Sequence, residues 1–500
     1  MKKIIAIIVL AVLLNNTSLA YAAPGANGYE GGISSGEVEG IQTYDYQEVV
    51  FITGEPVVYS GQLVIVRSAR TDTETTTYRY NLTSGENNRL TRTIVLDTKV
   101  EEKNNQWVRK SVLRSRPVER ITIGDITYTL DALSNVDFSM SSITDKRPAC
   151  DYFAGNWNGK KTYSNGNGQF ITVTTTGKTY GYDQHWGSAE VQEISIGIES
   201  TSQSETVPDH WAGRVDIKIS SSNSKQLIYM DNRPEEISFE GGYLQRQGNN
   251  SILQYTAYLP EFDSDGISTD RMIKYKDELS LQSFPRQERL PVPDLKKIKG
   301  HWYEKDVKEL YSLEVLDDKD FMPNQYMTRA EFAKAVVKAA KMPIEGEDTN
   351  TRTVRGRNNQ KEQKVSPFAD VPVDHPYYPY IYTLYTNGTM TGIGDKNFNP
   401  YGIINRVEAL TIFIRMLGFE GIAPNPTAVT LFRDNDIIPA WGRNSVAVAS
   451  HIGLVKGDDY GYLNPNQPMT KAEAAAFLNR FIGYMRYDII RDYRDRVMIY

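Results

Sequence analysis

The sequence predicts a protein of two parts: an N-terminal all-β region of antiparallel sandwich or barrel-like type, and a C-terminal all-α region. Three observations lead to this fold class. Apolar residues alternate with period two from about residue 44 to 283, they take helical spacing after about residue 291, and the helical part repeats itself. At roughly 100–200 residues per domain, 500 residues allow two to four folded units.

The composition excludes several classes of protein. Hydrophobic residues make up 40% and charged residues 24%, which is ordinary for a globular chain and excludes a wholly disordered one. A net charge of −6 gives no electrostatic reason to expect a nucleic-acid partner. The single cysteine, Cys150, excludes an intramolecular disulfide framework and a zinc site of several cysteines. We find no cofactor or nucleophile motif, and we predict no catalytic residue, cofactor or metal.

The first 22 residues have the pattern of a secretory signal peptide. A short cationic start precedes an apolar run over residues 4–14, and the Ala-Tyr-Ala sequence at residues 20–22 is a small-x-small cleavage signal. The apolar run is shorter than the roughly 20 residues that cross a bilayer as a helix. We therefore predict a secreted protein that has no membrane partner once residues 1–22 are removed.

The next region divides at about residue 44. Residues 23–43 are rich in glycine and serine, which predicts a flexible leader. Residues 44–290 hold runs of β-branched and aromatic residues separated by turn residues, a pattern typical of half-buried strands. One large or two smaller β domains fit this pattern equally well. The predicted strands are 73–82, 90–96, 121–130, 170–175, 191–198, 215–219 and 252–259.

The C-terminal part changes to helical periodicity. Residues 331–340 form an alanine-rich string in which Phe332, Ala335, Val336 and Ala339 fall on one face of a helix. Three copies of one pattern follow one another in this part. We assign them to residues 291–343, 367–422 and 428–485, with a polar, solvated insertion at 344–366 and a tail at 486–500.

Each copy is predicted to contain a helix, a loop, an extended Phe/Leu-x-Pro segment and a second helix. A proline stands six residues before a basic residue in every copy, and the basic residues are Arg329, Arg406 and Lys471. Three pairs beside them have capping-box spacing: Thr328 with Glu331, Asn405 with Glu408, and Thr470 with Glu473. A cation in the first turn opposes the helix dipole, so capping alone does not explain the basic residues. We interpret them as ligands for an anion near a helix N-terminus, with an inter-repeat salt bridge as the structural alternative.

These blocks resemble the S-layer homology (SLH) domains of bacterial cell-surface proteins. The Phe-x-Asp openings at Phe368 and Phe432, Trp302, Trp441 and the Tyr377-Tyr378 pair carry the resemblance further, over roughly residues 291–485. It implies an all-α pseudo-threefold trimer of copies in which one helix from each forms a central bundle. It also implies grooves between the copies that bind secondary cell-wall polysaccharide, often through its pyruvylated terminal sugar.

The resemblance assigns the ligand-binding cation to Arg329, Arg406 and Lys471. The carboxylate of a pyruvate ketal is a planar anion that a guanidinium grips with two hydrogen bonds, whereas lysine keeps only the charge. The loop residues expected to line the polysaccharide-binding grooves are Gly392, Gly394, Asp395, Gly457 and Asp458.

The first copy departs from the pattern. Glu314 and Asp318 stand where the other copies have glycine, which would allow a helix C-cap or a close approach of the ligand. The two carboxylates also repel an anionic glycan. We therefore predict that the groove using this loop is weakened or closed, and that those using 392–395 and 457–459 remain.

Two functions stay open for the whole chain. The first is a non-enzymatic surface protein, secreted and held at the cell wall or S-layer, whose β region serves assembly, adhesion or binding. Its partners would be the pyruvylated polysaccharide and other envelope proteins or further copies of itself. The second is a wall-anchored, glycan-active hydrolase with its active site in the β region, where His185, His210, Glu190 and Glu193 are the residues considered.

Overall fold

The computed structural model describes residues 31–35, 42–70, 73–202, 209–230, 241–264, 266–318, 320–344, 365–423 and 429–492. The predicted signal peptide and nearly all of the predicted insertion lie outside these residues. Within the described part, no helix combines the length and the apolar character needed to span a membrane.

The N-terminal part is all-β, as predicted, and forms one antiparallel sheet. The described residues give sixteen strands in this sheet. They are β1 (Ile33–Ser34), β2 (Thr43–Val50), β3 (Val57–Ala69), β4 (Thr73–Ser84), β5 (Asn88–Lys103), β6 (Gln106–Leu113), β7 (Val118–Ile123), β8 (Ile126–Leu130), β9 (Asp137–Lys146), β10 (Asp151–Ser164), β11 (Gln169–Gln184), β12 (Gly187–Ser202), β13 (His210–Met230), β14 (Gly242–Phe262), β15 (Ser268–Gln282) and β16 (Arg286–Pro291).

The sheet follows chain order except near β7 and β8 and at β16, which pairs with β14. The short strands β7 and β8 pair with each other and bridge β5 to β10, while β6 and β9 connect the same two strands elsewhere along their length. The strand predicted at 121–130 is therefore two strands with a turn at Gly124, whose φ is +59°. Strands β11 to β14 are much longer than the predicted runs, because turn-type residues such as Gly177 lie inside the ladder.

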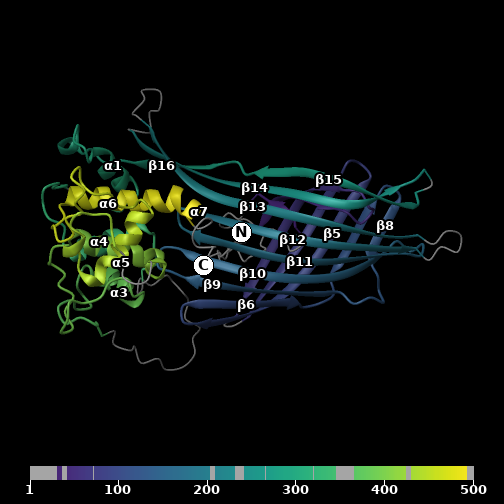
Figure 1. Ribbon diagram of the computed structural model, residues 1–500, viewed down its shortest axis with the longest axis horizontal. Coiled ribbons are helices and arrows are strands. Elements are labelled where there is room, and N and C mark those ends of the chain that lie inside the picture. The colour runs from purple at the N-terminus through teal and green to yellow at the C-terminus, as the bar shows by residue number, and fades with distance from the viewer. Residues whose placement is uncertain are drawn as a thin grey trace, which may run out of the picture.

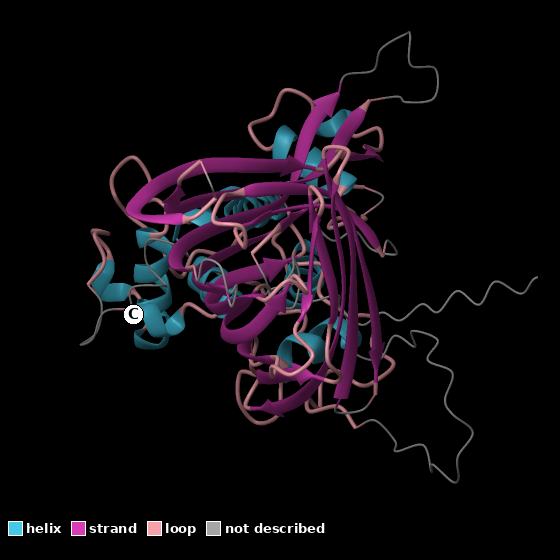
Figure 2. Cartoon of the chain, turned by 90° about the vertical axis from the view of Figure 1, so that its right-hand side faces the viewer, coloured by secondary structure: helices cyan, strands magenta, loops and turns pink. Residues whose placement is uncertain are grey.

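The sheet folds over into two layers. In Figure 1 the purple strands of the first half run obliquely behind the teal strands of the second half, and Figure 2 shows the curvature from the side. Leu63 and Leu82 from the first half and Val215 and Leu253 from the second are fully buried in one core between the layers. One continuous sheet with one such core answers the question of domain count that the sequence left open.

Part of the predicted flexible leader is ordered. Ile33 and Ser34 form β1, which pairs with β2, and Ile33 is completely buried. The side-chain amide of Asn249 in β14 donates a hydrogen bond to the carbonyl of Ser35. The segment therefore also contacts a strand near the other end of the strand order. The glycines that suggested flexibility permit close packing instead: a Cβ on Gly32 would lie 2.0 Å from the Tyr46 hydroxyl.

The core between the layers contains a buried cluster of charges. Arg92 donates hydrogen bonds of 2.9 and 3.0 Å to Glu48 and of 2.8 Å to Glu119, and Lys161 lies 3.1 Å from the other oxygen of Glu119. Burial alone would raise the pKa of Glu119, but the two cations outweigh it and hold the pKa at about 2. These residues belong to β2, β5, β7 and β10, so ion pairs between two carboxylates and two cations connect four strands inside the core.

The C-terminal part is helical. Its helices are α1 (Glu304–Ser312), α2 (Arg329–Ala339), α3 (Tyr378–Thr386), α4 (Arg406–Leu417), α5 (Ala440–His451), α6 (Lys471–Gly483) and α7 (Ile489–Asp492), with short helical turns at Lys296–Ile298, Glu420–Ile422 and Asn435–Ile437. A π-helical turn, Tyr484–Asp488, joins α6 to α7. The tail predicted from residue 486 is therefore helical up to Asp492, and its Ile489 is completely buried.

The second helices of the three copies end on the β part. The Trp186 indole donates 2.9 Å to the carbonyl of Ala339, the Ala149 amide donates 2.9 Å to Met416, and the Gln184 amide donates to Met485. These carbonyls lie at the C-terminal ends of α2, α4 and the continuation of α6, where helices leave acceptors unsatisfied. Cys150 and Trp186 join the helical hydrophobic core, so the two parts share one packed interface.

From the charge cluster we predict how a substitution changes the free energy of unfolding. Arg92→Met should lower the free energy of unfolding by about 3–5 kcal/mol, because it leaves two buried carboxylates short of their cation. Arg89→Met, at an exposed arginine of the same strand, should change it by less than about 0.5 kcal/mol in the same urea titration.

The pH dependence of unfolding gives a second readout on these proteins. A carboxyl with a lowered pKa stabilises the fold above its unfolded pKa of 4.5, and this stabilisation is lost as the pH falls towards 2. In Arg92→Met the loss should begin at higher pH. Equal stability of the Arg92 and Arg89 variants would contradict a role for the cluster.

Candidate functional site

The three predicted cations all lie between copies. Arg329 Nη1 is 2.7 Å from Glu408 Oε1, and Arg406 Nη2 is 2.9 Å from Glu473 Oε1. Lys471 Nζ is 2.8 Å from Glu331 Oε1 and closes the cycle. The inter-repeat salt bridge kept as the structural alternative is thus present in every copy.

Each glutamate of the cycle has two tasks. All three capping boxes form, with the side chain of the N-cap residue and that of the glutamate each accepting from the other's backbone amide. In each box the glutamate's Oε2 accepts the N-cap amide hydrogen bond, at 2.9–3.1 Å, which leaves Oε1 for the cation of the neighbouring copy. A local helix cap therefore also sets the position of an inter-repeat ion pair.

The pKa values agree with this double role. Burial would raise the pKa of Glu331, but hydrogen bonds from Lys471 and Thr328 outweigh burial and the pKa is lowered. Glu473 behaves in the same way, with the Thr470 amide and Arg406 as its donors. Both carboxylates are therefore ionised at neutral pH and bind their cations as full charges.

Backbone contacts repeat the same cycle. The amides of Arg329, Arg406 and Lys471 donate to carbonyls of Gly402, Gln467 and Gln325, each in another copy. The next amide of each helix donates to a carbonyl of Pro400, Pro465 or Pro323. The first helical amides are therefore occupied, and the idea that they hold the anion together with the cation is wrong: only the cationic side chains remain for it.

A groove lies beside Arg329. It has a volume of about 390 Å³, and its walls include Arg329 and Glu408, the loop around Gly392, Arg415 and Trp441. Arg329 also donates to the carbonyls of Phe398 and Thr391, at 3.1 and 3.2 Å. The indole of Trp441 is 55% exposed, so the groove combines guanidinium groups with an open aromatic face.

The groove predicted beside Arg406 has a less saturated cation. Arg406 Nη1 donates 3.1 Å to the carbonyl of Leu463, and its buried Nε has no hydrogen-bond partner in the described part of the chain. Asp458 lies in the loop of this groove. Its carboxylate accepts the amides of Tyr462 and Tyr460, and these hydrogen bonds together with Arg406 hold its pKa below the usual range.

The predicted loop glycines are needed for the loop itself. A Cβ on Gly392 would lie 2.6 Å from the carbonyl oxygen of Asn397 and 3.0 Å from the Phe368 ring. A Cβ on Gly457 would lie 3.1 Å from Gly461. Gly394 has a φ of +116° and is followed by Asp395 with a φ of +48°, so this loop turns through the left-handed region.

The departures of the first copy meet at one of the predicted grooves. Glu314 has a φ of +59°, against +68° and +77° at Gly388 and Gly453, so the three positions are structurally equivalent. The Asp318 carboxylate lies 3.0 Å from Lys471 Nζ, which also contacts Glu331. The substituted loop and the substituted cation therefore belong to the same groove, and the ammonium there has two intramolecular carboxylate partners.

The Phe-x-Asp openings have a role that sequence reasoning missed. Asp370 accepts the amides of Phe398 and Asn399 at 2.8 and 2.7 Å, and Asp434 accepts those of Leu463 and Asn464 at 2.9 and 2.7 Å. The aspartate thus ties the opening of a copy to its Phe/Leu-x-Pro segment. The recurrence of this aspartate at the same spacing in two copies was the feature of the sequence that could have indicated the role.

The residues considered for hydrolysis do not come together. His185 lies at the turn between β11 and β12, whereas His210 pairs with Thr201 at the other end of β12. Glu190 and Glu193 differ by an odd number of positions and face opposite sides of the sheet. Among the described residues no cluster of histidine, cysteine or carboxylate side chains could hold a metal ion.

Comparison with known proteins finds three tandem matches to one family in the C-terminal part. The S-layer homology domain model matches residues 293–333, 367–410 and 431–475. A cell surface protein of Thermoanaerobacter kivui is 31% identical over 126 residues, which is 25% of this chain and 16% of that protein. A surface-layer 125 kDa protein of Lysinibacillus sphaericus is 27% identical over 33% of this chain and 12% of its own length.

An enzyme is among the similar proteins. An amylopullulanase of Thermoanaerobacterium thermosulfurigenes is 30% identical over 36% of this chain and 9% of its own length. The matched part is less than a fifth of each of these three relatives. The domain matches and the surface-layer relatives indicate a secreted protein of the bacterial cell wall or surface layer.

The left-handed backbone conformation of Glu314 in the first copy leads to a testable prediction. Glu314→Gly should raise the free energy of unfolding by about 1 kcal/mol, because glycine adopts a left-handed conformation without the Cβ penalty. The matched reverse change, Gly388→Ala, should lower it by a similar amount, since a Cβ there meets no atom within 4 Å and only the backbone is affected. Destabilisation by Glu314→Gly in urea titrations would contradict the structural equivalence.

Proposed function

The C-terminal region of this chain carries three tandem S-layer homology domains, and we propose that they hold the protein non-covalently on an acidic secondary cell-wall polysaccharide. The observation that carries this proposal is the recurrence of a cation at the same place between copies, beside a groove of about 390 Å³ in the case of Arg329. We propose that the copies form the pseudo-threefold trimer of the family. The closed cycle of contacts and the stacking of buried Phe413 on Phe481, 4.5 Å apart, support this arrangement.

The two arginine grooves fit an acidic sugar best. A guanidinium has five donors, so Arg406 can keep its bond to Glu473 and still offer N–H groups to a ligand carboxylate. In the other groove Arg329 and Arg415 supply cations, and the open face of Trp441 suits an apolar face of a sugar ring. A pyruvylated terminal sugar provides both a carboxylate and a ring.

The lysine groove is proposed to bind weakly or not at all. Its cation faces Asp318 and Glu331, so an incoming carboxylate would have to displace an internal one and be repelled by the other. Anchoring would then depend on two grooves of the three.

The orientation of the helices suits anchoring. The cations lie at the N-terminal ends of α2, α4 and α6, and the β part is packed on their C-terminal ends. Polysaccharide bound at one end of the helical part would leave the β part directed away from it, as the separation in Figure 1 illustrates. We propose that the β part is displayed for envelope assembly, adhesion or binding.

The hydrolase alternative has less support. The enzymes among the relatives match no more than 36% of this chain, a share comparable to that of the helical repeats. Glu190 is buried and hydrogen-bonded to Thr179 and Gln192, and Glu193 is paired with Lys178. These carboxylates do not form the facing pair that glycoside hydrolysis requires.

Arginine-to-lysine changes test the grooves without removing charge. Arg329→Lys and Arg406→Lys should each weaken retention on purified pyruvylated wall polysaccharide by about tenfold, because lysine keeps the ion pair but loses the planar fork. Arg433→Lys, at an exposed arginine of the third copy, is the matched control and should bind normally. Undiminished binding of both groove variants in a co-sedimentation assay, or equal binding to depyruvylated polysaccharide, would refute the assignment.

The lysine groove gives the reverse test. Asp318→Gly should increase the number of pyruvylated saccharides bound per chain in isothermal titration calorimetry, because it restores a loop glycine and leaves Lys471 with one carboxylate partner, Glu331, instead of two. Asp320→Gly removes a carboxylate that is paired with Lys297 instead, and should leave the stoichiometry unchanged. An unchanged stoichiometry in Asp318→Gly as well would show that Asp318 does not close this groove.

A further inference from the structure

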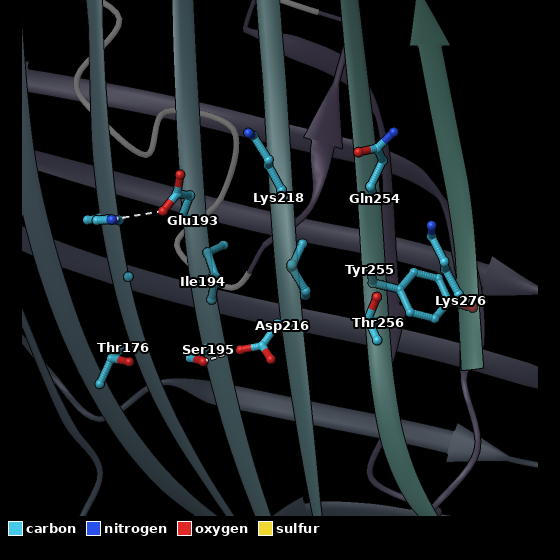
Figure 3. Close-up of a pocket in the computed structure, with 13 residues that line it drawn as sticks. Thr176, Glu193, Ile194, Ser195, Asp216, Lys218, Gln254, Tyr255, Thr256 and Lys276 are labelled. Carbon is cyan, nitrogen blue, oxygen red and sulfur yellow. Dashed lines mark hydrogen bonds and ion pairs between the residues drawn. The ribbon is translucent and has the colours of Figure 1, made fainter. Parts of the chain in front are cut away.

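A second candidate binding surface lies on the β part, away from the helical grooves. A groove of about 610 Å³ crosses strands β11 to β15, which is within the range of ligand sites in proteins. Figure 3 shows its lining residues on five adjacent strands, with strands of the first half crossing behind them. All of the described lining residues come from these five strands, and most of them belong to the face opposite the core.

The strand register gives the groove its shape. Two rows of side chains run across the strands, and the row between them points into the core, so that its backbone forms the floor. One wall is Lys178, Glu193, Lys218 and Gln254, and the other is Thr176, Ser195, Asp216, Thr256 and Lys276. The floor is Gly177, Ile194, Ile217 and Tyr255.

The dimensions fit a linear ligand. Neighbouring strands lie about 4.8 Å apart, so five strands give the groove a length of about 19 Å. Side chains two residues apart along a strand are about 7 Å apart, which sets the spacing of the two walls. A narrow channel of this length favours an extended chain over a compact small molecule.

The charges of the groove are not balanced internally. Glu193 is paired with Lys178 at 2.8 Å, and Asp216 accepts hydrogen bonds from Ser195 and from Arg214. Both carboxylates are therefore engaged. Lys218 and Lys276, on opposite walls, are exposed and form no ion pair within the described part of the chain. The pKa of Glu193 is lowered first by Lys178 and also by Lys218, its neighbour on β13, but among the described residues neither Lys218 nor Lys276 has a carboxylate in direct contact. Two such ammonium groups, one on each wall, favour a ligand that carries negative charges.

The position of the groove argues against a peptide. Strands β11 to β14 are interior strands whose backbone groups are engaged in ladders on both sides. A peptide that binds a sheet by strand addition pairs along a free edge. Strands β11 to β14 offer none, and the groove runs across the last strand of the order, β15, rather than along it. Recognition must therefore use side chains. One wall carries an amide and ammonium groups and the other carries hydroxyls and an ammonium group. These groups match the hydroxyls of a sugar chain, because a hydroxyl both donates and accepts.

From these observations we propose that the groove across β11 to β15 binds an extended, negatively charged polysaccharide chain. Lys218 and Lys276 would contact its anionic groups, and Thr176, Ser195, Thr256 and Gln254 its hydroxyls. This site does not depend on the proposed wall anchoring, since none of the described residues that line it belongs to the helical part.

The test uses the full chain with Arg329→Lys and Arg406→Lys in the background, so that the helical grooves contribute little. Fluorescence anisotropy with labelled polygalacturonate, alginate and hyaluronan fragments should show binding to at least one of them. Lys218→Gln with Lys276→Gln should weaken this binding at least fivefold. Thr256→Trp should weaken it similarly by filling the channel without changing charge.

The control is Lys103→Gln with Lys110→Gln, which removes two exposed lysines of β5 and β6 and should leave binding unchanged. Three outcomes would overturn the proposal: no binding to any of the three glycans, equal weakening by the control pair, or equal affinity for polyglutamate of matched charge. Because the background variants already impair the helical grooves, failure here would not count against the wall anchoring.

Discussion

The arrangement of the helical part depends on one shared carboxylate in each copy. Glu331, Glu408 and Glu473 each satisfy the first turn of their own helix with one oxygen and bind the cation of another copy with the second. The same residue therefore fixes where a helix begins and how two copies meet. The contact between two copies is positioned by the same interaction, since the cation of one copy is held by the glutamate of another.

The helical part and its motifs were largely predictable. Capping boxes, the repeat and the equivalence of Glu314 with Gly388 follow from local spacing, and local spacing is what a sequence displays directly. The cyclic pairing was not predictable, because residues far apart in the chain, such as Arg329 and Glu408 at 79 positions, meet only through tertiary structure. That Lys471 and Asp318 share one groove was hidden for the same reason: they are 153 positions apart.

The sequence predicted that the N-terminal part is all-β, but not the lengths of its strands, its buried charges or its docking on the helices. Period-two alternation identified strands, yet the long strands continue through glycines that local propensity treats as breaks, because a facing side chain such as Trp157 needs the space above Gly177. The burial of Arg92 among two carboxylates gives no local signal, since isolated charges in strands usually face solvent. The docking of the sheet on three helix ends likewise depends on carbonyls that every helix leaves open.

The central claim is that two of three similar grooves bind the carboxylate of an acidic wall sugar, while the third is occupied by the chain itself. The most direct measurement is a crystal structure of the protein with a pyruvylated terminal disaccharide. The account predicts a ligand carboxylate within hydrogen-bond distance of Arg329 and of Arg406, with Asp318 still on Lys471. A ligand bound at Lys471 with Asp318 displaced, or bound away from all three cations, would contradict it.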